Sequence, residues 1–170
     1  MQRRICVVAA MVCAMGAMAG AVPVMAQAKS GDEAAIRALY KQFNDGFNKK
    51  DVDAVMAVYA PDVFVFDVIP PRQYVGWDAY KKDWEGLFAG APGPISNTVK
   101  DLDITVVGPV AYTHYIATGT MTDKDGKPMH VVVRSTDVLR KEKGKWLIVQ
   151  EHNSLPVDLG TGQADMLSKP

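Results

Sequence analysis

Cysteine is scarce in this chain, and both cysteines, Cys6 and Cys13, lie near the N-terminus. Residues 29–170 therefore cannot form disulfides, zinc–thiolate sites or cysteine nucleophiles. No run or patch of basic residues occurs, so we expect no nucleic-acid partner. His, Asp and Glu show no metal-site spacing, and glycine loops that cradle phosphate are missing. We expect no metal site and no cofactor.

The first 28 residues are typical of a secretory signal peptide. Arg3 and Arg4 precede a long apolar run without charge, and Ala26–Ala28 has the small residues of a cleavage site. An uncleaved membrane anchor is the alternative, because the apolar run is long. Pro23 and the small residues favour cleavage. We expect export to the periplasm or the medium, with no membrane attachment once residues 1–28 are removed.

The remaining chain, residues 29–170, suits one domain with a sizeable core. Without Arg3 and Arg4 it has two more acidic than basic residues, and it contains no repeats. Residues 158–170 are polar and contain glycine, which is typical of a flexible tail. We therefore expect a domain at residues 29–157 and a flexible tail at residues 158–170.

Three helices are predicted before the main strands. Asp32 is expected to cap the first, which runs to about Asn48 and carries an apolar stripe at helical spacing. Asp51 begins a shorter second helix with Tyr59 on its apolar side, and a third covers about Asp78–Phe88. The predicted strands are Val63–Asp67, Gln73–Val75, Ser96–Val107 with an irregularity near Asp101, Val110–Thr120, Val131–Lys141 and Lys145–Ser154.

The last two predicted strands form a hairpin, because Gly144 suits a loop over Lys141–Gly144. This loop pairs Arg140 with Lys145. One face then begins with the core residues Leu139, Trp146 and Ile148 and continues into Asp137, Gln150, His152 and Ser154. Buried polar groups need partners or a wet cavity, which indicates a pocket; a strand that runs out into solvent is the alternative. The other face pairs Arg134 with Glu151, an expected ion pair.

Helices followed by long strands with short turns indicate an α+β fold. We expect a curved antiparallel sheet whose concave face is covered by the three helices. Such a sheet encloses a cavity, where ligand sites tend to form.

Two stretches resemble a known family. Asn48–Asp67, NKKDVDAVMAVYAPDVFVFD, and Gly144–Ser154, GKWLIVQEHNS, resemble the cone-shaped nuclear-transport-factor-2-like (NTF2-like) fold. That superfamily includes ketosteroid isomerases and SnoaL-like polyketide cyclases, and the second stretch is closest to the SnoaL-like branch. It is also similar to the association domain of calmodulin-dependent protein kinase.

The resemblance to ketosteroid isomerases implies roles for three residues. Asp67 falls at their general-base aspartate, and Asp137 falls near their second, protonated aspartate. Phe43 occupies the position of their oxyanion-donating tyrosine and has no hydroxyl, which argues against steroid isomerisation. Tyr40 lies one turn earlier on the same stripe. One fold hosts many functions, so the resemblance implies the fold more strongly than an activity.

Three residues are candidates for catalysis. Asp67 is a base if its strand face is interior, or a cap of the following loop if it is not. His152 is an acid, a base or a ligand donor, or else a structural histidine. With Asp137, it would polarise or protonate a substrate. The candidate ligand-binding residues are Tyr40, Phe43, Tyr59, Trp84 and Gln150.

Two functions follow from these predictions. The first is an exported domain that binds a hydrophobic small molecule in an apolar pocket and, if it is an enzyme, catalyses cofactor-free isomerase- or lyase-type proton transfer. The second is a non-enzymatic binding or assembly module that forms a homodimer through its sheet. The first requires Asp67 and His152 to face one cavity.

Overall fold

The computed structural model describes residues 24–123 and 125–169. Of the predicted signal peptide, residues 1–23 lie outside the described part, and residues 24–28 belong to the first helix. The elements in chain order are α1 (Val24–Asn48), α2 (Val52–Met56), β1 (Tyr59–Phe66), β2 (Tyr74–Val75), α3 (Trp77–Gly90), β3 (Ile95–Val107), β4 (Val110–Thr122), β5 (Pro128–Glu142) and β6 (Lys145–Ser154).

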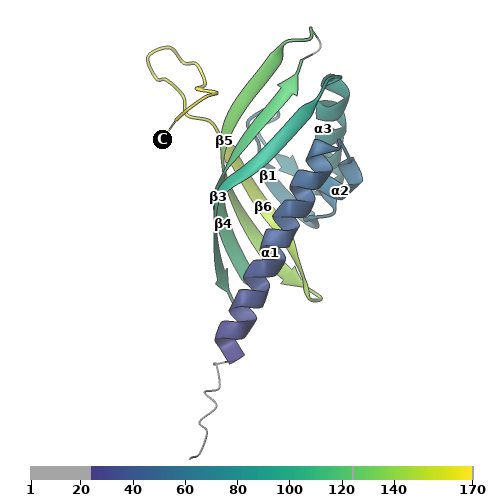
Figure 1. Cartoon of the computed structure of the whole chain (residues 1–170), viewed down its shortest axis with the longest axis vertical. Helices are drawn as coiled ribbons and strands as arrows, with labels where there is room; N and C mark the ends of the chain where they lie inside the picture. Colours follow the sequence, from purple (N-terminus) through teal and green to yellow (C-terminus); the bar gives the residue numbers. More distant parts are fainter. Residues whose placement is uncertain (1–23, 124, 170) are drawn as a thin grey trace, which may run out of the picture.

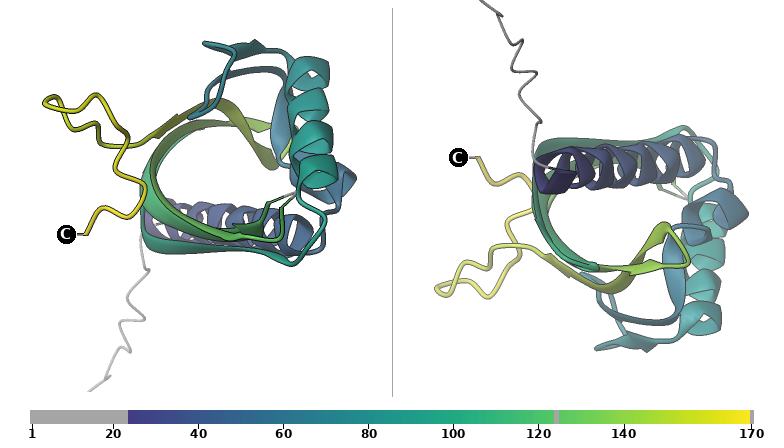
Figure 2. Two further views of the ribbon diagram at one scale, coloured as in Figure 1. Left: turned by 90° about the horizontal axis from the view of Figure 1, so that it is seen from above. Right: turned by 90° about the horizontal axis from the view of Figure 1, so that it is seen from below.

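The strands form one curved sheet in the order β2-β1-β6-β5-β4-β3. The sheet is strongly curled, with α3 across its open side and α1 packed along β3 (Figures 1 and 2). This is the predicted α+β cone. One detail differs from the prediction, because β1 runs parallel to β6, whereas the other neighbours are antiparallel.

The stripe on α1 packs into the core as predicted. Ile36, Leu39, Tyr40 and Phe47 are buried. The rings of Phe43 and Phe47 meet Trp84 of α3 edge-on, at centroid distances of 5.6 and 5.7 Å. Aromatic side chains bury large apolar areas in such clusters. The two helices are therefore joined through their aromatic side chains over the concave face of the sheet.

Asp32 does not cap α1, because the helix begins eight residues earlier. Its Oδ1 instead accepts hydrogen bonds from Lys141 Nζ at 2.5 Å and Trp146 Nε1 at 3.1 Å. These contacts fasten the helix to the β5–β6 hairpin. Asp51 does cap α2, since its side chain accepts a hydrogen bond from the Ala54 N–H at 3.0 Å. The second helix ends at Met56, so that Tyr59 belongs to β1.

The β5–β6 hairpin has a tighter turn than predicted. Glu142 pairs with Lys145, and only Lys143 and Gly144 lie between them, both with positive φ. Two consecutive positive φ values are typical of the type I′ turn that joins twisted strands. The predicted register was wrong by two residues, which leaves each side chain on its predicted face as far as Ile148.

Beyond Ile148 a β-bulge changes the faces of β6. Leu139 pairs with Ile148, but Val138 pairs with Gln150, so Val149 is an extra residue in this strand. An inserted residue reverses the alternation that follows it. Glu151 and Asn153 therefore take the inward positions that the even-numbered residues were predicted to hold. A second irregularity, predicted near Asp101, is confirmed: β3 shifts register between Lys100 and Asp103.

The C-terminal segment, predicted as a flexible tail, makes backbone contacts beyond β6. The backbone N–H of Val132 donates to the Met166 carbonyl at 2.8 Å, and that of Asp165 donates to the Pro156 carbonyl at 2.8 Å. Val157 and Ala164 form a β-bridge. The segment therefore continues beside β5, past the end of β6 (Figure 1). Among the described residues no helix is both long and apolar enough to span a membrane.

Candidate functional site

A cavity of about 400 Å³ lies between the concave face of the sheet and helices α1 and α3. Its apolar wall comes from both helices, from β4 and β5, and from the C-terminal segment. Its polar end carries Asp67, Ser135, Glu151 and Asn153. Cavities of this size with a few convergent polar groups are typical small-molecule sites.

Asp67 follows β1 at the cavity wall. Val63 and Val65 on the same strand face are fully buried, which brings the next side chain of that face inward. Asp67 Oδ1 accepts a hydrogen bond from the Val68 backbone N–H at 2.6 Å. Burial raises the pKa of Asp67 above its usual range despite this hydrogen bond, and the nearby negative charge of Asp83 adds to the rise. Asp67 thus combines the predicted inward position with the loop-capping contact.

Glu151 is the second carboxyl at the polar end, and its side chain is only 3% exposed. It accepts hydrogen bonds from the hydroxyls of Tyr59 at 2.6 Å and Tyr80 at 2.8 Å, and from Asn153 Nδ2 at 2.7 Å. Burial, followed by the negative charge of Asp67, raises the pKa of Glu151 to about 7, and the hydrogen bonds oppose this rise. Glu151 is therefore a carboxyl that exchanges its proton near neutral pH.

Tyr80 links the two carboxyls. Its hydroxyl lies 2.8 Å from Glu151 Oε1 and 3.1 Å from Asp67 Oδ2. Burial raises the pKa of Tyr80 well above its usual value, so the phenol keeps its hydrogen. A phenol has one hydrogen to donate. It can donate to one carboxyl and accept from the other when that one is protonated, so Asp67, Tyr80 and Glu151 can share a proton.

A second buried network lies behind the cavity wall. The Tyr40 hydroxyl donates to Asp137 Oδ2 at 2.6 Å and is 2.5 Å from Thr113 Oγ1. Asp137 is fully buried, and its Oδ1 has no partner among the described residues. Burial, and secondly the charge of Glu151, raises the pKa of Asp137 well above its usual value. Neither Asp137 nor Tyr40 lines the cavity.

His152 does not face the cavity. It is exposed and lies on the opposite face of β6 from Glu151, with its ring 5.6 Å from that of Phe66. The expectation that Asp67 and His152 share one cavity is therefore wrong, and the form of the enzymatic function that required this pair is wrong with it. The bulge at Val149 is the physical reason, because it places Glu151 instead of His152 at the cavity. Gln150 is half-buried on the same outward side and does not line the cavity either. The predicted ion pair of Arg134 with Glu151 fails for the same reason.

The other candidates divide between the cavity and the wall behind it. Phe43 and Trp84 line the cavity, whereas Tyr59 supports it from behind through Glu151. The sequence did not indicate Tyr80 and Glu151 as functional residues. Tyr80 lies on the apolar stripe of a helix, and Glu151 was predicted to lie on the outer face of its strand. The sign in the sequence is the run Trp146–Val149, four consecutive apolar residues that break the period of two.

The described part of the chain has no group of three or more His, Cys, Asp or Glu side chains placed to hold a metal ion. The site contains three carboxyls of raised pKa and a largely apolar chamber. The Tyr80 phenol lies between Asp67 and Glu151, and the third carboxyl, Asp83, accepts a hydrogen bond from the Tyr74 hydroxyl at 2.6 Å. A carboxylate there can accept a proton from a bound molecule, and a carboxylic acid can return it. The fold and site thus define a cone-shaped α+β domain with an acidic cavity.

A family model described as the SnoaL-like domain matches residues 36–158. The chain belongs to this family, within the NTF2-like superfamily. No curated protein matches the chain.

Solved structures carry the same fold. An NTF2-like protein of unknown function from Pseudomonas putida KT2440 is 28% identical with a TM-score of 0.76, over 83% of this chain and 98% of that one. An NTF2-like superfamily protein from Salmonella enterica is 19% identical with a TM-score of 0.69, over 79% and 98%. A ketosteroid isomerase-like protein from Erwinia carotovora atroseptica is 24% identical with a TM-score of 0.62, over 71% and 93%. The last two identities are low enough that the likeness speaks for the fold alone.

Proposed function

We propose that this SnoaL-like domain binds a hydrophobic small molecule in its cavity and moves a proton on it by general acid–base catalysis. The observation that carries the proposal is the placement of Asp67 and Glu151, joined by the Tyr80 hydroxyl, in the wall of a largely apolar chamber. Isomerisation, cyclisation and dehydration by proton transfer need only such groups.

The roles of the two carboxyls follow from their surroundings. Glu151 accepts three hydrogen bonds and is nearly enclosed, whereas Asp67 is less buried and ends a strand at the cavity wall. We assign Asp67 as the base that contacts the substrate. Glu151 then holds the proton that Tyr80 passes toward Asp67, which lets the base be reset between turnovers. Asp137 is too far behind the wall for the substrate-polarising role that the family resemblance implies.

The test has two stages. A library of hydrophobic compounds is screened by thermal shift, where a ligand at a hundredfold excess over its Kd should stabilise the protein by about 2.7 kcal/mol. Each hit that contains an acidic carbon is then incubated in deuterated water, and deuterium incorporation is followed by NMR. We expect exchange with the wild type, and loss of exchange with retained binding for Asp67→Asn. Binding without any exchange would leave the binding function and remove the enzymatic one.

Assembly is the second candidate function, and an apolar patch supports it. Val107, Val110 and Tyr112 are exposed at one end of β3 and β4, on the face turned away from the buried residues Ala111 and Thr113. Exposed apolar clusters often mark protein interfaces. We propose a homodimer formed through this outer face. Sedimentation equilibrium of the wild type and of Tyr112→Glu tests it, since a monomeric wild type would refute the assembly proposal.

We also propose that the protein is exported to the periplasm or the medium. The features of residues 1–28 support this proposal. Mass spectrometry of protein recovered from a host's periplasm or medium should give a chain that begins at Lys29. Recovery of the uncleaved chain in the membrane fraction would contradict it.

A further inference from the structure

The hydrogens at the polar end of the cavity are almost all committed to protein acceptors. The Ser135 hydroxyl donates to Asn153 Oδ1 at 2.6 Å, and Asn153 Nδ2 donates to Glu151 Oε1 at 2.7 Å. The hydroxyl of Tyr59 donates to Glu151 Oε2. Two carboxylates offer about eight lone-pair sites between them. This end of the cavity therefore has acceptors to spare and few hydrogens to offer a ligand.

The charge of the cavity has one sign. The ionisable carboxyls among its lining residues are Asp67, Asp83 and Glu151, and the described lining contains no Lys, Arg or His. An anionic ligand would bring like charge to a partly desolvated site without a cation to balance it, which is unfavourable. A ligand with a cationic head group would meet opposite charge.

A separate observation indicates that the chamber is made for an occupant. Trp84 lines the cavity and is only 7% exposed, yet its indole N–H has no acceptor among the described residues. A buried donor without a partner is costly, and an acceptor or a ring of a bound molecule would relieve that cost. The rings of Phe43, Phe47 and Tyr115 also line the chamber. Aromatic faces attract organic cations.

We propose that the ligand of this cavity is a hydrophobic amine whose protonated head group donates a hydrogen bond to Asp67, beside the negative charge of Glu151, while its apolar body lies in the chamber. This inference rests on the proposed function and names the chemical class of its ligand. The ammonium hydrogens supply the donors that the polar end lacks, and the ammonium charge pairs with the carboxylates.

Binding of an ammonium ion should displace the proton held between the two carboxyls. The titratable groups that face this proton are Asp67 from the end of β1, Tyr59 from β1, Tyr80 and Asp83 from α3, Tyr115 from β4, Asp137 from β5 and Glu151 from β6. The phenols keep their hydrogens, because burial raises the pKa of Tyr59 and Tyr80 well above the usual value. The displaced proton therefore leaves a carboxyl and enters the solvent.

The test uses three probes with one apolar body and different heads: naphthylmethylamine, naphthylmethanol and naphthoate. Affinity is measured by isothermal titration calorimetry near neutral pH, in two buffers of different ionisation enthalpy. We expect the amine to bind at least about tenfold more tightly than the alcohol, because its hydrogen bonds to carboxylates are charge-assisted. Naphthoate should bind weakest. The buffer dependence should show net proton release with the amine and none with the alcohol.

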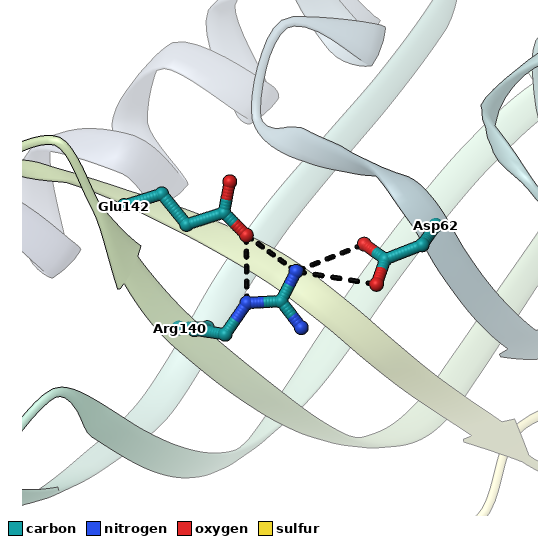
Figure 3. Close-up of polar contacts among 3 residues, drawn as sticks. All are labelled: Asp62, Arg140 and Glu142. Carbon is teal, nitrogen blue, oxygen red and sulfur yellow. Dashed lines mark hydrogen bonds and ion pairs between the residues drawn. The ribbon is translucent and has the colours of Figure 1, made fainter.

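Two cavity variants locate the effect of the carboxylates on amine binding, and a third variant, at the outer surface, is the matched control. Glu151→Gln and Asp67→Asn should each reduce the amine's advantage over the alcohol severalfold. Asp62→Asn removes one negative charge from the outer surface. There the Asp62 carboxylate pairs with Arg140 at 3.0 Å, and Arg140 also pairs with Glu142 (Figure 3). This variant should leave the advantage unchanged.

Each outcome bears on one proposal or on both. If the alcohol or naphthoate binds the wild type as tightly as the amine does, the amine inference is overturned and the binding function stands. An amine advantage that persists in both cavity variants also overturns it, because the head group would then lie elsewhere. If no probe binds at any concentration that its solubility allows, the chamber does not accept hydrophobic molecules, and the proposed function falls with the inference.

Discussion

The stability of the domain should fall as the pH rises past neutrality, because Glu151 must lose a proton inside the protein. In the unfolded chain its pKa returns to its ordinary value of 4.5, whereas in the folded protein it is about 7. The folded state therefore binds the proton more tightly. This contribution is fully present below about pH 4.5 and is lost as the pH rises through about 7.

The size of the effect follows from the two pKa values. One pKa unit corresponds to about 1.4 kcal/mol, so a rise from 4.5 to about 7 is worth about 3 kcal/mol, most of which is lost between pH 5 and 8. This loss is a large share of the ~5–15 kcal/mol stability of an ordinary domain. Asp67 adds in the same direction, because burial raises its pKa as well.

The assay compares the wild type with Glu151→Gln, which keeps the shape of the side chain and removes the titration. Urea unfolding followed by tryptophan fluorescence gives the free energy of unfolding at about pH 5 and about pH 8. The difference between wild type and variant should move by about 3 kcal/mol in favour of the variant at the higher pH. Asp62→Asn is the control for net charge. A difference that stays constant across this range, or moves the other way, would refute the burial of a titrating carboxyl at this position.

Three further predictions concern the fold around the site. Gly46→Ala should destabilise the protein by about 1–3 kcal/mol in urea unfolding, because its Cβ would lie 2.9 Å from an α2 side chain. A Cβ at Gly86 would have no neighbour within 4 Å among the described residues, so Gly86→Ala should instead stabilise α3 by about 0.5–1 kcal/mol; equal effects of the two substitutions would contradict the α1–α2 contact. Tyr59→Phe should cost about 1–3 kcal/mol and raise the pKa of Glu151, since it removes a donor to a buried carboxylate; an unchanged stability–pH profile would count against this contact. Deletion of residues 158–170 should leave the circular dichroism spectrum unchanged and weaken ligand binding about tenfold, because two cavity-lining residues are lost; equal affinity would mean that this segment does not enclose the ligand.

Much of the fold could be predicted because its signals are local. The α1 stripe repeats at helical spacing over three turns, and Asp51 precedes an apolar segment as a cap does. The irregularity at Asp101 interrupts an alternating strand and corresponds to a real shift of register. The prediction for Asp67 also used local information, since its face could be counted from Val63 and Val65.

The candidate site was predicted only in part, because it combines segments that are far apart in the chain. Tyr80 and Glu151 are separated by 71 residues and meet only when α3 crosses the sheet. No spacing rule within either segment indicates such a meeting. The same holds for the C-terminal segment, whose polar composition is typical of a loose tail but whose backbone pairs with β5 at Val132.

The amino-acid sequence by itself determined the elements, the α+β class and the inward position of Asp67, since periodicity and capping act within a few residues. The tertiary structure decided which face of β6 carries chemistry. That strand is paired on both sides, with β1 and with β5, and the extra residue at Val149 is accommodated between these partners. The bulge turns Glu151 inward and His152 outward, and a pattern read along one strand cannot locate it because the register is set by neighbouring strands.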